Sequence, residues 1–432
     1  MRVQKICPHH HQPTMTHINL HTPITKGFYN GTQRLIDPAE TVARAWQHAP
    51  AMGITRIANV TGLDRIGIHV VMVSRPNAKS ISVSQGKGLT LDAAKASGIM
   101  EAIEGYHAES ILKPLIQGSY DELSAAGYSL VDVSRLPKLR GKNYQTHMPL
   151  LWIEGFDLLN ETAKWVPYQV VHTIYTTPTV TLAGETPFVM TSNGLASGNH
   201  LLEAIVHAIN ELVERDATTL WDLDSPENKA KTTLDQASIT APEATALLEQ
   251  LDAAKIDVYI WHQPTDIGLP TFRCEIYERT LTQMQRRIPF VGFGTHLTKS
   301  IALTRALTEA VQSRLIYIAG VRDDLELGLY AVPDLEEQLG ARKQARDAMQ
   351  GMVDYASLAD NPHDTFNEDL RFQLDGLCKA GIEEVIAIDL TQPRFDIPVV
   401  RVVIPGLEAT QLIGAQFTAG ARGQRVLQAR NQ

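Results

Sequence analysis

The chain lacks most of the features that would tie it to a membrane, an oxidising compartment or a nucleic acid. Its 432 residues contain three cysteines, too few and too widely spaced for a disulfide framework. No apolar run reaches the roughly 20 residues of a membrane span, and the N-terminus has no signal-peptide core. Acidic residues outnumber basic ones, 48 to 39, which disfavours nonspecific nucleic-acid binding because phosphates require cations. These absences predict a cytoplasmic protein with neither a membrane nor a nucleic acid as partner.

The common nucleotide-binding fingerprints are also missing. There is no Gly-x-x-x-x-Gly-Lys-Ser/Thr P-loop and no convincing Gly-x-Gly-x-x-Gly sequence. The composition, 44% hydrophobic and 20% charged, is that of an ordinary globular protein. Any nucleotide site in this chain must therefore be built in another way.

What the chain does contain is a unit that occurs three times, in which a β-prone run, glycines and a long helix-prone run follow one another. We predict that the glycines form loops between strand and helix; they are Gly86-Lys87-Gly88, then Gly194 and Gly198, then Gly294. The predicted strands and helices of the units are residues 80–84 and 91–108, 188–191 and 201–221, and 288–293 and 301–318. Outside the units we predict strands at residues 68–73, 256–261, 384–390 and 397–404, and a peripheral helix within residues 228–255.

Each of the three predicted helices places acidic or amide side chains on one face. At about 100° per residue, these stripes consist of Ser97, Glu101 and Glu104, of Glu203, His207, Asn210 and Glu214 with Glu211 at the edge, and of Glu309 and Gln312. The second helix is otherwise strongly apolar, which is typical of a helix buried on most sides. Its acids therefore face either a narrow wet strip or an interior cleft.

The acidic stripes have two interpretations. They are either solvated helix faces, with Glu211 and Arg215 as a surface ion pair four residues apart, or the walls of a cation site. Acids three residues apart repel each other, and Mg²⁺ binds through carboxylates together with the phosphate oxygens of a substrate. Recurrence in three similar segments favours the cation site. The glycines before the helices then predict a phosphate cradle to which Lys87 adds charge.

Two histidine features also leave alternatives open. His207 either is a satisfied helix histidine or acts on a ligand, as an orienting group or general base. The segment with Cys7 and residues 9–11, all histidine, could bind a soft metal but matches no zinc-ligand spacing. We interpret residues 1–51 as an arm that faces a partner.

With these motifs the chain resembles the YcaO family of ATP-dependent enzymes that modify peptide backbones. The resemblance runs from about residue 56 to residue 320 and resumes at residues 397–408; residues 61–68 and 82–88 look most like the subset associated with TfuA proteins. The motifs are Ser97-x3-Glu101-x2-Glu104, Asn199-x3-Glu203-x7-Glu211-x2-Glu214-Arg215, Glu309-x2-Gln312-x-Arg314 and Val403-Ile404-Pro405-Gly406-Leu407-Glu408.

The resemblance implies an α+β fold of the YcaO ATP-binding type, with mainly antiparallel sheets flanked by helices. The catalytic domain would span residues 52–410 and be followed by a tail at residues 411–432. It further implies ATP and Mg²⁺ as cofactors, a peptide or protein substrate, and Arg215, Glu214 and Glu101 in catalysis, with Arg215 stabilising the transferring phosphoryl group. Mg²⁺ would be held by Glu101, Glu104, Glu211 and Glu214, and ATP by Ser97, Asn199, Glu203, Arg215, Glu309 and Gln312, with Lys87 added from the glycine loop.

The family implies that ATP phosphorylates a backbone amide oxygen while a nucleophile attacks the carbon, which yields an azoline, a thioamide or an amidine. Azoline-forming members commonly end in a proline-rich tail, whereas this chain has no proline after Pro405. That difference favours thioamide formation with an external sulfur donor and a TfuA-like partner. Azoline formation on Cys, Ser or Thr of a precursor peptide and a non-catalytic scaffold that binds nucleotide or leader peptide are the alternatives. We expect a homodimer.

Overall fold

The computed structural model describes residues 3–4, 18–175, 187–279, 289–321, 340, 344, 353–409 and 418–430. Within them the chain forms three sheets and a small hairpin, and the strands of each pair are antiparallel except for β1 and β7. The predicted α+β class with mainly antiparallel sheets is confirmed. None of the described helices combines the length and apolar character needed to cross a membrane.

The largest sheet in the described part of the chain has the order β1-β7-β8-β14-β15-β10, with β9 paired to β8. Its strands are β1 (Val3–Gln4), β7 (Leu115–Ser119), β8 (Pro149–Asp157), β9 (Thr162–Pro167), β10 (Leu195–Ser197), β14 (Ile386–Asp389) and β15 (Val399–Val403). The other sheets are β4 (Arg56–Asn59), β5 (His69–Ser74) and β6 (Val83–Gly88); β11 (Ile256–His262), β12 (Thr271–Glu278) and β13 (Phe290–Thr295); and the hairpin β2 (Gly27–Tyr29) and β3 (Thr32–Arg34).

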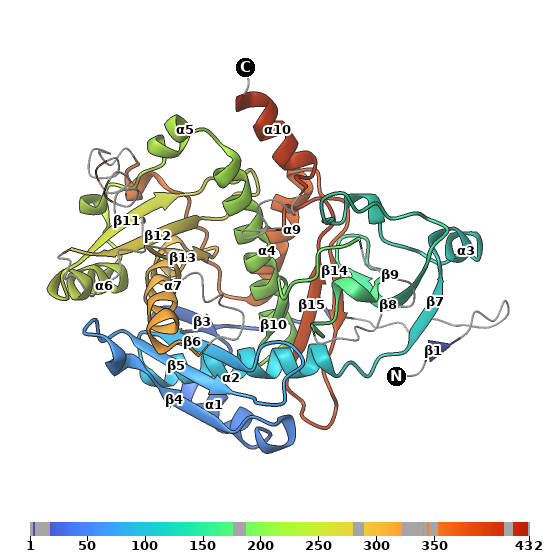
Figure 1. Ribbon diagram of the computed structural model, residues 1–432, viewed down its shortest axis with the longest axis horizontal. Coiled ribbons are helices and arrows are strands. Elements are labelled where there is room, and N and C mark those ends of the chain that lie inside the picture. Colours follow the sequence, from blue (N-terminus) through green and yellow to red (C-terminus); the bar gives the residue numbers. More distant parts are fainter. Residues whose placement is uncertain are drawn as a thin grey trace.

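Three long helices run between these sheets and meet in the middle of the molecule. In Figure 1, α4 passes through the centre, α7 stands to its left and α2 lies along the bottom. They are α2 (Leu91–Glu109), α4 (Leu201–Leu223) and α7 (Lys299–Ala319). The remaining described helices are α1 (Pro38–Trp46), α3 (Tyr120–Ala125), α5 (Pro226–Lys231), α6 (Pro242–Ala253), α9 (Phe366–Lys379) and α10 (Ala421–Arg430).

Each long helix buries apolar side chains against a different surface. Helix α4 packs with α9 on one face of the large sheet, where Ile205 and Ile209 join the core of Val400 and Val402. Helix α2 contributes Ile103 to the core on the opposite face. Helix α7 packs on β12 and β13 and also touches β6. The polar stripes of the three helices are thereby turned toward the junction between the sheets.

The predicted glycine loops of the first and third units are wrong. Gly86, Lys87 and Gly88 belong to β6, which pairs with β5 along its whole length, and Gly294 belongs to β13. The reason is close packing: a Cβ on Gly86 would lie 2.0 Å from the carbonyl oxygen of Ala94, and one on Gly294 would lie 2.1 Å from that of Ala302. Glycine here lets a helix rest directly on a strand rather than end the strand.

The second predicted unit is correct in its helix but wrong in its strand. Residues 188–191 form no strand; Phe188 makes only an isolated bridge to Lys138, although its side chain is fully buried. The strand is β10, which follows the turn at Asn193 and Gly194 and pairs with β15. Gly194 therefore precedes the strand instead of following it. The β-prone residues at 188–191 are therefore explained by burial of side chains and not by strand pairing.

The other predicted elements are confirmed, with small shifts in their ends. Strands β5, β11, β14 and β15 and the peripheral helix α6 occur within a few residues of the predicted ranges. The strand predicted at residues 80–84 starts at Val83, and the strand predicted at residues 288–293 starts at Phe290. Boundaries at residues 51 and 410 stay predictions, and residues 5–17, with most of the histidines of the arm, lie outside the described part.

Candidate functional site

The carboxylates predicted from three separate helices lie around one junction. Glu104 of α2 reaches β10, where Oε1 accepts hydrogen bonds from the backbone N of Ser197 at 2.9 Å and its Oγ at 2.7 Å. Glu309 of α7 forms an ion pair with Lys87 of β6. Glu211 of α4 accepts a hydrogen bond from the backbone N of Gly194 at 2.9 Å. Glu104 and Glu309 are therefore each held by a strand of another unit, and Glu211 is held by the turn that precedes β10.

Glu104 carries the strongest sign that negative charge is crowded here. Its burial, together with the negative charges of Glu101 and Glu211, raises its pKa to about 8 against the hydrogen bonds from Ser197. Glu101 itself accepts a hydrogen bond from the backbone N of Gln85 at 3.2 Å. Carboxylates from two helices thus interact directly, and without a cation one of them keeps its proton near neutral pH.

Glu214 and Arg215 form the centre of the α4 contribution. Glu214 is 3% exposed, and burial together with Glu309 raises its pKa to about 7 against the attraction of Arg215. Arg215 Nη1 lies 3.4 Å from Glu214 Oε1, and Nη2 lies 3.6 Å from Glu211 Oε1. The interpretation of this stripe as a solvated helix face is wrong for Glu214, because its carboxyl is buried. The predicted pair of Glu211 and Arg215 does form, and both side chains are half-buried.

Glu309 completes the arrangement from α7. Burial alone would raise its pKa, but Lys87, Arg215 and Arg305 outweigh it and hold the pKa of Glu309 below its ordinary value. Its second oxygen accepts a hydrogen bond from the backbone N of Phe293 at 3.3 Å. An ionised carboxylate therefore lies between the two cations that sequence motifs had assigned to nucleotide binding, Lys87 and Arg215.

A group of cations beside the acids was missed in the sequence. Arg34 of β3 and Arg305 of α7 each leave Nε buried without a hydrogen-bond partner among the described residues. Burial lowers the pKa of Arg34. The negative charges of Glu203 and Glu104 raise this pKa, and the positive charge of Arg305 lowers it further. Arg305 lies one helical turn before Glu309 and could have been found from that spacing; Arg34 follows a segment with no periodic pattern and could not.

His207 faces this cationic group. Burial and the positive charges of Arg305, Arg34 and Lys87 hold the pKa of His207 well below its ordinary value, so the imidazole is neutral at physiological pH. Burial likewise lowers the pKa of His296 to about 3. Neutral histidines beside unpartnered arginines indicate a region that awaits negative charge from outside the described residues.

The remaining predicted residues lie on the three long helices or just before the start of α4. Glu203 Oε2 accepts a hydrogen bond from the backbone N of Asn199, the residue before the N-cap of α4, at 2.9 Å. Asn199 Oδ1 accepts one from Thr41 Oγ1 at 3.4 Å, and Nδ2 of Asn199 is buried without a partner among the described residues. Ser97 lies half-buried one turn before Glu101, and Gln312 is buried one turn beyond Glu309.

Arg314 belongs to the same sequence motif but has another role. Its Nε lies 3.0 Å from Asp64 Oδ2, and Nη2 lies 2.5 Å from Glu278 Oε1. These ion pairs tie α7 to the end of the short helix η2 (Thr61–Leu63), which follows β4, and to the end of β12. Its place in the motif therefore reflects stability of the fold.

The residues fit Mg²⁺ and a triphosphate together better than either one alone. No three His, Cys, Asp or Glu side chains in the described ranges are close enough to hold a metal between them. Mg²⁺ bound with a nucleotide needs only one or two carboxylates, because phosphate oxygens and water complete its shell. The partnerless Nε atoms of Arg34 and Arg305 are suited to the phosphates. The assignment of four glutamates to Mg²⁺ stays a prediction.

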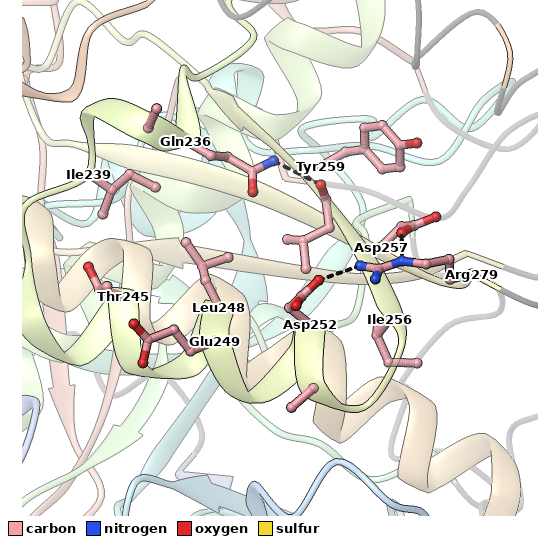
Figure 2. Close-up of a pocket in the computed structure, with 13 residues that line it drawn as sticks. Gln236, Ile239, Thr245, Leu248, Glu249, Asp252, Ile256, Asp257, Tyr259 and Arg279 are labelled. Carbon is pink, nitrogen blue, oxygen red and sulfur yellow. Dashed lines mark hydrogen bonds and ion pairs between the residues drawn. The ribbon is translucent and has the colours of Figure 1, made fainter.

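A separate groove of about 810 Å³ lies away from this junction, between α6 and the edge of β11. Figure 2 shows Arg279 reaching toward Asp252 and Asp257, with which it forms ion pairs, and Gln236 bonded to the backbone of β11. None of the residues predicted for the site lines it. Its only arginine is already paired, so it offers little to an anionic ligand.

Comparison with known proteins defines first the fold and then the family. A solved YcaO structure from Methanopyrus kandleri, described as bound with AMPPCP and Mg²⁺, is similar with a TM-score of 0.68 at 23% identity, covering 89% of this chain and 94% of that one. A heterocyclase described as in complex with substrate and cofactor has a TM-score of 0.66 at 22% identity; 91% of this chain is covered but 55% of the heterocyclase. At these identities the similarity concerns the fold.

The sequence comparisons go further. A family model described as YcaO cyclodehydratase, ATP- and Mg²⁺-binding, matches residues 85–408. A protein from the tfuA 3′ region of Rhizobium leguminosarum bv. trifolii is 33% identical over 90% of this chain and 91% of its own. One from Methanothermobacter thermautotrophicus is 32% identical over 86% and 94%. The chain belongs to the YcaO family, and the predicted cofactors ATP and Mg²⁺ are confirmed for that family.

Proposed function

We propose that the chain uses ATP to activate a backbone amide of a peptide or protein and replaces the amide oxygen with sulfur. Membership in the YcaO family supports the use of ATP and Mg²⁺ for backbone modification. The observation that carries the proposal is that the buried Glu214 and the half-buried Glu104, Glu211 and Glu309 meet at one junction, beside arginines of β3 and α7 whose Nε atoms have no partner among the described residues. Phosphoryl transfer depends mainly on positioning and charge neutralisation, which such a junction provides.

The roles follow from the charges already present. Arg34, Arg305 and Lys87 bind the phosphates, and Arg215, between Glu211 and Glu214, neutralises the charge on the transferring phosphoryl group. The carboxylates of the site would hold Mg²⁺, which would supply positive charge beside the phosphates. His207 is neutral and therefore adds no further positive charge beside these cations.

The proposed reaction balances without an oxidant or reductant. Hydrosulfide adds to the amide carbon, the carbonyl electron pair moves to oxygen, and that oxygen takes the γ-phosphoryl group from ATP with release of ADP. Loss of the S–H proton then forms the C=S bond and expels the former amide oxygen within inorganic phosphate. The products are a thioamide, ADP and phosphate.

Similarity to a relative from a tfuA region favours sulfur over ring closure by a side chain and supports a TfuA-like partner. The described residues 421–430 form α10, which Arg422 ties to α4: its Nη2 lies 2.9 Å from Asp216 Oδ2 and 2.5 Å from Asp266 Oδ1. A homodimer stays a further prediction.

The test measures ATP consumption and product mass with Mg²⁺, sulfide and candidate peptides. Arg215→Ala should lower kcat by about 10³-fold, as expected when a charge-stabilising arginine is lost, and Glu214→Gln should act in the same direction. Glu383→Gln, at an exposed position, is the control and should retain wild-type rates. A peptide heavier by sulfur minus oxygen supports the proposal, whereas one lighter by a water molecule indicates azoline formation. If both site variants leave ATP consumption intact, the reaction does not take place at this site, and the non-catalytic scaffold is favoured.

A further inference from the structure

Arg401 is a buried cation that the roles above do not use. It lies in β15, is 4% exposed, and leaves Nε and Nη1 without a hydrogen-bond partner among the described residues. In the sheet it lies opposite Leu195 of β10 and Ile388 of β14. A buried guanidinium without an ion pair destabilises the folded protein, so an arginine at this position indicates a function.

His172 adds a second unpartnered donor to the same region. Its Nδ1 accepts a hydrogen bond from the backbone N of Ile174 at 3.1 Å, so the proton of the neutral ring is on Nε2. That Nε2 is buried and has no partner among the described residues. Burial and the positive charge of Arg401 lower the pKa of His172 to about 4, which keeps the ring neutral. Val399 and Val403, on the same face of β15 as Arg401, share a core with Val170 and Val171, which directly precede His172.

Two hydroxyl groups border these donors. The Tyr168 ring packs on His172 with centroids 4.6 Å apart, and the OH of Tyr168 and the Oγ1 of Thr173 are both buried without a partner in the described part. The charge of Glu211 acts on Arg401, but no acid among the described residues forms an ion pair or hydrogen bond with its guanidinium. A region rich in donors with a single positive charge is suited to one small monovalent anion.

The position of Arg401 links this region to the phosphoryl-transfer junction. Leu195, its partner in the sheet, lies between Gly194, which donates to Glu211, and Ser197, which donates to Glu104. The backbone N of Val402 also donates to the carbonyl oxygen of Gly194 at 2.7 Å. Arg401 is therefore one strand away from the backbone groups that hold Glu211 and Glu104.

We propose that Arg401 and His172 bind the anionic nucleophile, which in the thioamide reaction is hydrosulfide. This assignment rests on the proposed function, because only there is a small anion required beside the amide. The phosphates are matched by several cations at the junction, whereas Arg401 offers one charge, which a monovalent anion neutralises. Arg401 here is a binding residue for the second substrate, separate from the nucleotide residues.

The test is anion-dependent thermal stability of the full chain, measured anaerobically with and without Mg–AMPPCP. Sodium hydrosulfide should raise the Tm in a saturable way, while sodium phosphate at equal ionic strength should not. Arg401→Met should abolish the hydrosulfide shift and leave the ligand-free Tm unchanged or higher, because it removes a buried unpaired charge. His172→Phe keeps the ring against Tyr168 and should weaken hydrosulfide binding about tenfold, the loss of one hydrogen bond to an ion.

The controls separate this site from other roles of arginine. Arg279→Met, at an ion-paired arginine of the distant groove, should keep the hydrosulfide shift. Both Arg401→Met and His172→Phe should bind Mg–AMPPCP like the wild type and raise the KM for sulfide without changing that for ATP.

A lower ligand-free Tm of Arg401→Met with the hydrosulfide shift retained would show a structural arginine and overturn the proposal. So would a shift produced by phosphate instead. Failure of the wild type to bind Mg–AMPPCP would refute the proposed function, whereas nucleotide binding without any hydrosulfide effect would refute only this inference.

Discussion

At the scale of single residues, the site is a balance between acids that repel and cations that lack partners. Burial raises the pKa of Glu104 to about 8 and that of Glu214 to about 7, while Lys87, Arg215 and Arg305 hold Glu309 ionised against its burial. Charges of both signs are thus kept in one place at a cost to stability. Such an arrangement is typical of a site whose ligand brings the missing charges, here Mg²⁺ and phosphates.

This balance predicts a pH dependence of stability without ligand. Glu104 and Glu214 keep their protons to higher pH in the folded protein than in the unfolded chain, whose glutamates titrate near the ordinary value of 4.5. The folded protein therefore holds more protons in this window, and the Tm should fall as the pH rises from about 5 to about 9. Glu104→Gln should reduce the slope, which thermal unfolding measures, while the exposed Glu383→Gln should leave it intact.

Magnesium should reverse the trend, because carboxylates must lose their protons before they bind a metal. The affinity for Mg–AMPPCP, measured by calorimetry, should rise over the same pH range. A Tm without ligand that rises with pH would contradict the assignment of both carboxyls to the crowded junction.

At the scale of elements, contact between glycine-bearing strands and helices positions the acids. Helix α2 rests on β6 at Gly86, and α7 rests on β13 at Gly292 and Gly294, with no side chain between. Because the helices lie so close, Glu309 of α7 reaches the neighbouring strand β6, where it pairs with Lys87. The spacing between glycines and acids in the sequence is a consequence of this packing.

Gly86→Ala tests the packing directly. The added Cβ would lie 2.0 Å from the carbonyl oxygen of Ala94 and 2.3 Å from the backbone N of Gly98, so α2 must move away from β6. We expect a loss of about 3 kcal/mol or more in the free energy of unfolding, measured by denaturant titration. Gly62→Ala is the matched control, because its Cβ would meet nothing within 4 Å. Equal stability of the two variants would show that the strand tolerates a side chain and that the glycines have another purpose.

At the scale of the whole molecule, the junction exists only because separate sheets are brought together. The large sheet supplies β10, the β4-β5-β6 sheet supplies Lys87, and the β11-β12-β13 sheet carries α7. In Figure 1 these parts surround the lower half of α4. A ligand at the junction should therefore connect all of them, and its effect should spread beyond any one helix.

Hydrogen–deuterium exchange tests this connection. Saturating Mg–AMPPCP should slow exchange in α2, α4 and α7 together and in β3, which carries Arg34, since a ligand that binds only the folded state stabilises it. Helix α6, beside the separate groove of Figure 2, should change little. Protection limited to one of the three helices would contradict a shared site.

The sequence by itself determined the long helices, the acids on their faces and the membership of the family. These features are local, since a helix has a fixed period and the motifs lie within single helices. Only the tertiary structure decided that the glycines are packing contacts, that residues 195–197 rather than 188–191 form the strand, and that Arg34, Arg305 and Arg401 approach the acids. Strand pairing and the approach of side chains join positions far apart in the chain, and no local pattern encodes which ones will meet. The acidic helices could be read from residue spacing, whereas the cations that face them could be found only in the folded molecule.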